Sequence, residues 1–253
     1  LALAFVDRDD AKPNAARTVY VSTAFIGIYH VPYKELIPNV LKHYKIGIET
    51  GDLENAAYNI YCYCYLRFMS GDRLDTMDSL MAEYEDNVKK QDVVANFYAL
   101  YHQLVQNLLG KSDDPLTLSG CVCDEKIIRK QMEDQNNEVG LFDLYTKKMM
   151  LSYLFYDFRL ALASCESAMR YMHAAKTKHD VPIALFYQAL TICMLLKSYT
   201  GNNRSAYWRV LKRNIRKIKT LSKHSPSSFL HKYWLLAAEL AMLKGDNAVA
   251  EKS

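Results

Sequence analysis

The residues of this chain that could bind a metal ion or act as nucleophiles are six cysteines and seven histidines. Cys62 and Cys64 lie in a segment of helical periodicity, where residues two apart point about 200° apart and cannot chelate one ion together. Cys121 and Cys123 lie near a predicted loop and are less constrained, but structural zinc sites usually place two to four residues between paired cysteines. The sequence therefore predicts buried core thiols at Cys62 and Cys64. A metal site over residues 121–125, completed by a distant histidine, is the minor alternative.

The other chemistry-bearing residues form no recognisable catalytic motif. The histidines are scattered, at His30, His43, His102, His173, His179, His224 and His231, and none forms His-Glu-x-x-His. Gly-x-Ser-x-Gly, the phosphate loop Gly-x4-Gly-Lys-[Ser/Thr] and the kinase signatures His-Arg-Asp and Asp-Phe-Gly do not occur. The acidic pairs at 9–10 and 113–114 lie in predicted loops, where capping or solvation explains them. We predict no catalytic, cofactor-binding or metal-binding residue in this segment, which is therefore not expected to be an enzyme by itself.

The composition is that of an ordinary globular chain that favours helix. Half of the residues are apolar, and only 9 glycines and 6 prolines occur among 253 residues. The 19 tyrosines suit half-buried seams between helices and the walls of grooves. The net charge of +4 is too small to indicate nucleic-acid binding by itself.

Targeting and membrane-spanning signals are weak. No signal peptide is evident, and the longest apolar stretch, Ile183 to Leu196, is shorter than the roughly 20 residues of a membrane span. Free thiols predict a reducing, cytoplasmic location. Because the first residue is Leu1, not methionine, we expect a fragment, a processed chain or a domain excerpt of a longer protein.

Periodicity and helix breakers predict an all-α chain with short connections, which fold consecutive helices into antiparallel hairpins. The longest expected loop covers residues 111–120. The predicted helices are 15–29, 33–49, 53–69, 74–89, 93–109, 125–135, 141–156, 159–175, one from about 182 to 201, 205–221, and a final pair that starts near 228 and turns at 245–246.

Three of these hairpins carry small residues where tetratricopeptide repeats place them, at the close crossing of two helices and at the turn between them. In the second hairpin Tyr156 stands where the turn glycine is expected. An α-solenoid of irregular tetratricopeptide-like hairpins is predicted, with an irregular helical bundle as the alternative. The residues assigned to repeat packing and turns are Gly47, Gly51, Ala56, Ala161, Ala168, Ala238, Gly245 and Ala250.

Several runs resemble one helical region of very large signalling proteins. The runs are 30–32, 44–58 (YKIGIETGDLENAAY), 107–115 (NLLGKSDDP), 153–168 and 229–250 (FLHKYWLLAAELAMLKGDNAVA). In those proteins a serine/threonine kinase-like domain and an AAA-type ATPase domain precede a tetratricopeptide-like region. A GAF domain and a sensor histidine kinase often follow it.

The resemblance implies a function and a domain layout. It implies a non-catalytic coupling segment whose partners are protein domains, either neighbours in the same chain or other signalling proteins. Residues 1–16 would be a linker or the end of a preceding domain. Residues 17–253 would form the helical domain, with a division into two lobes near 111–124. The alternatives are a stand-alone peptide-binding regulator and an all-helical enzyme, which would need a deep pocket with convergent polar groups.

The most distinctive predicted surface is a basic helix near the C-terminus. Leu211, Ile215 and Ile218 form an apolar stripe at helical spacing, so the charges should occupy the opposite face. A solvated face is the simplest interpretation, and an acidic partner or anionic lipid is the alternative. Nucleic acid is disfavoured because the helix lacks interleaved aromatic residues. The residues assigned to an acidic-partner surface are Arg209, Lys212, Arg213, Arg216 and Lys217.

Overall fold

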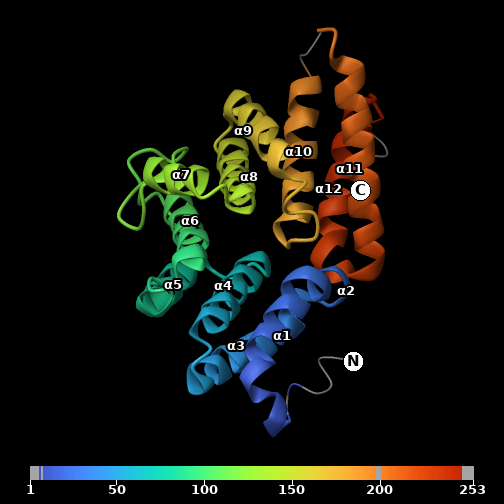
Figure 1. Cartoon of the computed structure of the whole chain (residues 1–253). Helices are drawn as coiled ribbons and strands as arrows, with labels where there is room; N and C mark the ends of the chain where they lie inside the picture. The colour runs from blue at the N-terminus through green and yellow to red at the C-terminus, as the bar shows by residue number, and fades with distance from the viewer. Residues whose placement is uncertain (1–5, 7, 198–200, 247–253) are drawn as a thin grey trace. The chain divides into compact units, whose positions relative to one another are not determined.

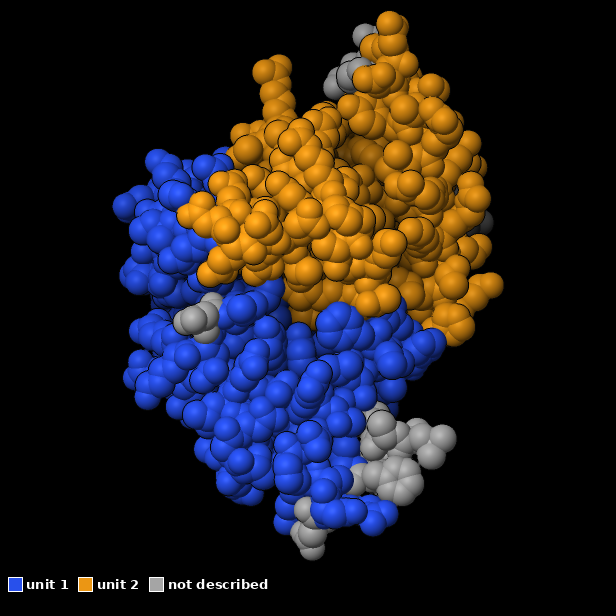
Figure 2. Space-filling model, viewed as in Figure 1, with its two compact units in different colours: residues 1–131 blue, residues 132–253 orange. Residues whose placement is uncertain are grey.

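Helices form all the regular secondary structure in the computed structural model, which describes residues 6, 8–197 and 201–246. No strand occurs within those ranges, so the all-α class is confirmed. The chain divides into two compact units, residues 1–131 and residues 132–253, which are coloured separately in Figure 2. The division falls inside a helix that follows the loop near which the sequence predicts a boundary.

Unit 1 begins with a continuous helical run and continues as hairpins (Figure 1). Residues 12–16, which the sequence assigns to a linker or to the end of a preceding domain, form the first turn of α1, and Ala15 and Ala16 are buried there. The elements are η2 (Asp9–Ala11), α1 (Lys12–Ser22), the π-helical η3 (Thr23–Gly27), α2 (Ile28–His30), α3 (Tyr33–Thr50), α4 (Leu53–Met69), α5 (Leu74–Val88), α6 (Asp92–Leu108) and the start of α7 (Glu125–Asp134).

Helices α3 and α4 cross most closely at Gly47. A Cβ atom added there would lie 2.9 Å from the Cβ of Ala56 and 3.1 Å from that of Ala16. Ala56 is completely buried. The turn between the two helices is made by Gly51, whose φ of 78° is the left-handed conformation that only glycine adopts without strain. Small residues thus let three helical segments approach at one point.

Gly47→Ala is expected to loosen this crossing, although alanine favours helix more than glycine. We expect the free energy of local opening to fall by about 1–3 kcal/mol, the usual cost of overpacking. Hydrogen exchange of α3 and α4 peptides would measure it. The double variant Gly47→Ala/Ala56→Gly moves the methyl group to the other helix and should recover at least half of the protection. Equal protection in wild type and Gly47→Ala would contradict the proposed crowding.

Unit 2 is built from a hairpin, a central apolar helix and a second hairpin (Figure 1). The side chains of Asn137 and Asp157 accept N-cap hydrogen bonds from Gly140 and Leu160, and so define the starts of α8 and α9. The core lies mainly on α10 and is joined by α11 and α12. The elements are α8 (Glu138–Leu154), α9 (Phe158–Tyr171), α10 (Asp180–Leu196), α11 (Arg204–His224) and α12 (Pro226–Leu243).

The turn between α8 and α9 contains Tyr156 in the left-handed conformation, with φ of 65°. Its side chain is 80% exposed, so little packing offsets the backbone strain. We expect Tyr156→Gly to stabilise unit 2 by about 0.5–1 kcal/mol, the strain relieved less the extra chain entropy of glycine. Urea unfolding followed by tryptophan fluorescence is the measurement. A loss of stability would mean that the ring's edge contact with Phe158 outweighs the strain.

Five ionisable side chains form one buried cluster inside unit 2. Lys147 donates to Asp143 within α8, and the ammonium group of Lys178 lies 3.8 Å from Asp143 and 2.9 Å from Asp180. His179 Nε2 lies 3.4 Å from Asp180. Each of these side chains is at most 6% exposed. The cluster therefore fixes the segment before α10 to α8 by charge rather than by apolar packing.

Candidate binding groove in unit 1

The loop between α6 and α7 folds back along α6 and creates the candidate site. Helix α6 ends at Leu108 and is followed by Gly110, which has φ of 72°, and the amide of Lys111 donates to the carbonyl of Gln106 at 2.9 Å. Asp124 caps α7, since its carboxylate accepts from the amide of Lys126 at 2.7 Å. The loop thus begins and ends on geometrically defined helix termini.

Two fully buried amide side chains of α6 hold this loop. Asn107 donates to the carbonyls of Pro115 and Thr117 at 3.1 and 2.7 Å. Gln103 donates to the hydroxyl of Ser112 at 2.9 Å and accepts from the amide of Val122 at 3.3 Å. These bonds satisfy backbone groups that the irregular loop leaves without helical partners. The amides replace the regular hydrogen bonding that a helix would supply.

Gly120 is required where the loop passes over Gln103. A Cβ atom at this position would lie 2.6 Å from Gln103 Nε2, whose amide already bonds Asn107 and Ser112. We expect Gly120→Ala to displace Gln103, cost about 1–3 kcal/mol and raise hydrogen exchange in residues 111–124. Gly110→Ala is the control variant. Gly110 has a positive φ but open space around it, so an alanine there strains the backbone without contacting Gln103. Unchanged exchange in Gly120→Ala would contradict the clamp.

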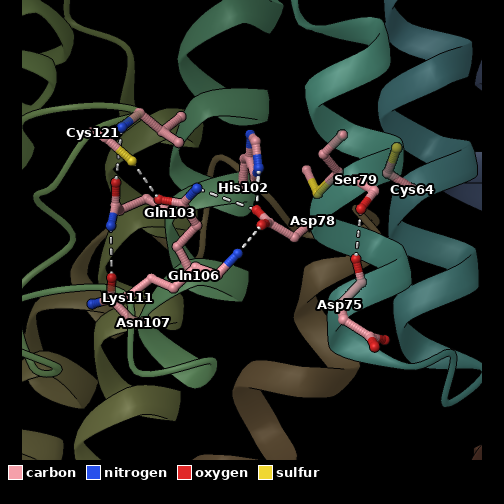
Figure 3. A network of polar contacts seen from close by, with 12 residues as sticks. Cys64, Asp75, Asp78, Ser79, His102, Gln103, Gln106, Asn107, Lys111 and Cys121 are labelled. Carbon is pink, nitrogen blue, oxygen red and sulfur yellow. Dashed lines mark hydrogen bonds and ion pairs between the residues drawn. The ribbon is translucent and has the colours of Figure 1, made fainter.

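A polar network joins the loop to α5 through Asp78 (Figure 3). Its carboxylate lies 2.7 Å from His102 Nε2, 3.2 Å from Gln106 Nε2 and 2.6 Å from the ammonium group of Lys111. Burial by itself would raise the pKa of Asp78, but the hydrogen bonds from Lys111, His102 and Gln106 outweigh it and hold the pKa below its ordinary value. The network is therefore a charged tie between α5, α6 and the loop.

The two loop cysteines lie in different surroundings. Cys121 is exposed and its thiol donates to Gln106 Oε1 at 2.9 Å (Figure 3). Cys123 is partly buried, and its sulfur lies 3.4 Å from the carbonyl of Leu118. Burial, together with Asp124 and Glu125, raises the pKa of Cys123 to about 12. Within the described residues no group of three or more histidine, cysteine or acidic side chains could hold a metal ion.

The far side of the same loop lines a groove of about 260 Å³. Val88 comes from α5, Ala95 and Ala99 from α6, Val122 from the loop and Ile127 from α7, so most of its wall is apolar. Ile127 is 59% exposed at the edge of the groove. The remaining lining residues are Glu85, Lys89, Asn96, Tyr98, Cys123, Asp124, Ile128 and Gln131. The groove is an apolar surface with charges of both signs at its edge.

Tyr98 forms part of the groove wall and is anchored from behind. Its hydroxyl donates to the carbonyl of Met81 at 2.8 Å, and the sulfur of Cys64 lies 3.9 Å from it. Cys62 and Cys64 are both fully buried in α4. Burial raises the pKa of Cys64 to about 12, so this thiol is packed rather than poised for reaction.

The other residues singled out in the sequence do not line this groove. Ala161 and Ala168 are fully buried on α9, and Gly245 follows α12 with φ of 77°. Ala238 is partly buried on α12, and Ala250 lies outside the described residues. The five basic residues of the predicted acidic-partner surface are exposed on α11: Arg209, Lys212, Arg213, Arg216 and Lys217.

Sequence reasoning did not find the groove. The available signal was the run Cys121-Val122-Cys123 between turn formers and a helix start, with the alanines at 95 and 99 one helical turn apart on α6. No family model, no curated protein and no solved structure matches this chain. Among the described residues, no helix has both the length and the hydropathy needed to cross a membrane.

Proposed function

We propose that this chain is a non-catalytic, helical protein-interaction module, and that the groove between α5, α6 and α7 receives apolar side chains of a partner protein. The groove itself supports this: it is mainly apolar, it is open along one side, and it carries Ile127 exposed at its edge. Large exposed apolar side chains at a concave surface are typical of interaction sites.

The size of the groove favours a peptide over a substrate. Small-molecule sites commonly enclose about 300–1,000 Å³, and a volume of about 260 Å³ is below that range. It suits one or two side chains of an amphipathic helix, which presents apolar anchors three or four residues apart. Glu85, Lys89 and Asp124 at the edge could then pair with polar residues beside those anchors.

The fold proposed for the module is an irregular solenoid of tetratricopeptide-like hairpins. Support comes from the close α3–α4 crossing at Gly47, the positive φ values at Gly51, Tyr156 and Gly245, and the buried Ala161 and Ala168. Together with the resembling runs, this supports a cytoplasmic segment that couples an ATPase or kinase part of a larger signalling protein to its output domain.

Filling the groove tests the binding function. Helical peptides selected by display on the wild-type chain should carry apolar residues at i and i+4 and bind with micromolar affinity. Ala99→Trp should weaken them at least tenfold in calorimetric titration. Ala82→Trp, on the exposed face of α5, is the matched control and should bind normally. Failure to select any peptide, or equal binding to all three proteins, would refute the groove as the site.

The coupling role is tested in the full-length protein. If the segment transmits a signal, Ala99→Trp should reduce the output activity of the parent protein, and Ala82→Trp should leave it unchanged. An output that is unaffected when the whole segment is deleted would remove coupling from the proposal, but would leave peptide binding by a stand-alone regulator.

A further inference from the structure

The second hairpin of unit 2 concentrates positive charge. Helices α11 and α12, which lie side by side, contain nine lysine and arginine residues and a single carboxylate, Glu239. The whole chain has a net charge of only +4, so the remainder is net negative. Helix α11 contains no aspartate or glutamate at all along its 21 residues. The overall composition of the chain therefore does not account for this local excess of positive charge.

The charges of α11 occupy one face and are not neutralised. Leu211, Asn214, Ile215, Ile218 and Ser222 are buried on the opposite face. Among the described residues, none of the basic side chains at 209, 212, 213, 216 and 217 forms an ion pair with a carboxylate. With the exposed Lys219 and Lys223 of the same helix, these residues extend about 20 Å along the helix axis. The face is therefore an elongated cationic strip rather than a set of isolated surface pairs.

Exposed apolar side chains lie on α12, the helix that packs against α11. Leu230, Trp234 and Leu235 are 37%, 43% and 46% exposed. The ammonium group of Lys219 lies 5.3 Å from the ring centre of Tyr233, and that ring is 5.1 Å from the ring of Trp234. The cationic strip and the exposed tryptophan are thus linked through one tyrosine.

We propose that this surface binds the headgroup region of an anionic lipid bilayer. Each lysine or arginine near such a surface contributes about 1 kcal/mol, and tryptophan and leucine partition into the interface beneath the headgroups. An acidic protein would use the charges alone and leave Leu230, Trp234 and Leu235 in water. A single-stranded nucleic acid would need aromatic rings interleaved with the charges, and Tyr207 and Trp208 lie together at the start of α11, both partly buried.

Vesicle flotation with the full chain tests the proposal. Vesicles of phosphatidylcholine with about one-third phosphatidylserine should carry the protein upward, pure phosphatidylcholine vesicles should not, and high salt should weaken the binding. Arg213→Glu/Lys217→Glu should reduce partitioning at least tenfold. Lys34→Glu/Lys45→Glu makes the same charge change on exposed positions of α3 and should bind as wild type.

Tryptophan fluorescence then tests insertion. In a Trp208→Phe background the emission of Trp234 should shift to the blue on adding anionic vesicles, and Leu230→Ser/Leu235→Ser should weaken binding without changing its salt dependence. Three outcomes would overturn the proposal: no flotation, equal flotation with both vesicle types, or binding to polyglutamate or RNA without binding to vesicles. None of these vesicle experiments depends on peptide binding to the groove in unit 1.

Discussion

Replacing Asp143 by asparagine is expected to lower the free energy of unfolding of unit 2 by about 3–5 kcal/mol. The substitution preserves shape but removes the carboxylate that lies between the ammonium groups of Lys147 and Lys178. Asp180, whose carboxylate lies 2.9 Å from the ammonium group of Lys178, would remain. Removing one partner of a buried charge cluster leaves the opposite charge in a medium that solvates it poorly, which makes the loss large.

Urea unfolding followed by tryptophan fluorescence would measure this effect, because Trp208 and Trp234 are the only two tryptophans and both belong to unit 2. Glu166→Gln removes the same charge from an exposed position of α9 and should change the free energy by less than about 0.5 kcal/mol. A loss below about 1 kcal/mol in Asp143→Asn would show that the carboxylate is not the charge that balances the two lysines.

The second large effect expected is a loss of unit 2 stability on mild acidification, caused by His179. Burial lowers the pKa of His179 from 6.5 to about 3, with Lys178 and Lys147 adding to it and Asp180 opposing. The unfolded chain takes up a proton below pH 6.5 and the folded chain does not until about pH 3. This contribution is therefore fully present above pH 6.5 and falls by about 1.4 kcal/mol per unit below it, or about 2 kcal/mol by pH 5.

Measuring the free energy of unfolding against pH for wild type and His179→Gln isolates the contribution of His179. Burial raises the pKa of Asp143, so Asp143 favours the folded chain as the pH falls, opposite to His179. The pKa of Asp180 is held below its ordinary value, so Asp180 adds to the acid loss only below pH 3.8. Both groups remain in the variant, so the free energy of unfolding of wild type should fall by about 2 kcal/mol relative to that of the variant as the pH falls from 7 to 5. Parallel profiles would mean that His179 takes up its proton at the same pH in the folded chain as in the unfolded chain.

The helices follow from residues whose effects are local. The prediction for α4, residues 53–69, matches its observed bounds, because Gly51 ends α3 just before it and Gly71 follows its last turn, both with positive φ. The break at Val31-Pro32 is equally local, since the residue before proline avoids helical geometry. Helix α1 starts at Lys12, three residues before the predicted start at residue 15, and Pro13 lies in its first turn, where proline is tolerated.

The groove and the buried charge cluster depend on residues far apart in the chain. Asp143 and Lys147 are four residues apart, a spacing that by itself indicates an exposed helix pair. Only the approach of Lys178 and Asp180 to α8 buries them. Likewise, Gln103 and Asn107 have no signal in the sequence that separates a loop clamp from ordinary polar positions on a helix. Packing between residues far apart in the chain determines both the groove and the buried charge cluster, and the periodicity of the sequence does not encode that packing.

The exposure of Cys121 makes one position of this chain chemically addressable. Of the six cysteines it alone is exposed, and burial raises the pKa of the thiols of Cys64, Cys123, Cys165 and Cys193 to about 11–12. Because the thiolate is the reactive form, a maleimide dye should label the native chain once. Unfolding would expose the remaining five thiols. The number of labels per molecule, measured by mass spectrometry, therefore reports how many of the buried cysteines have become exposed by unfolding. The single label on the native chain lies on the loop that lines the groove.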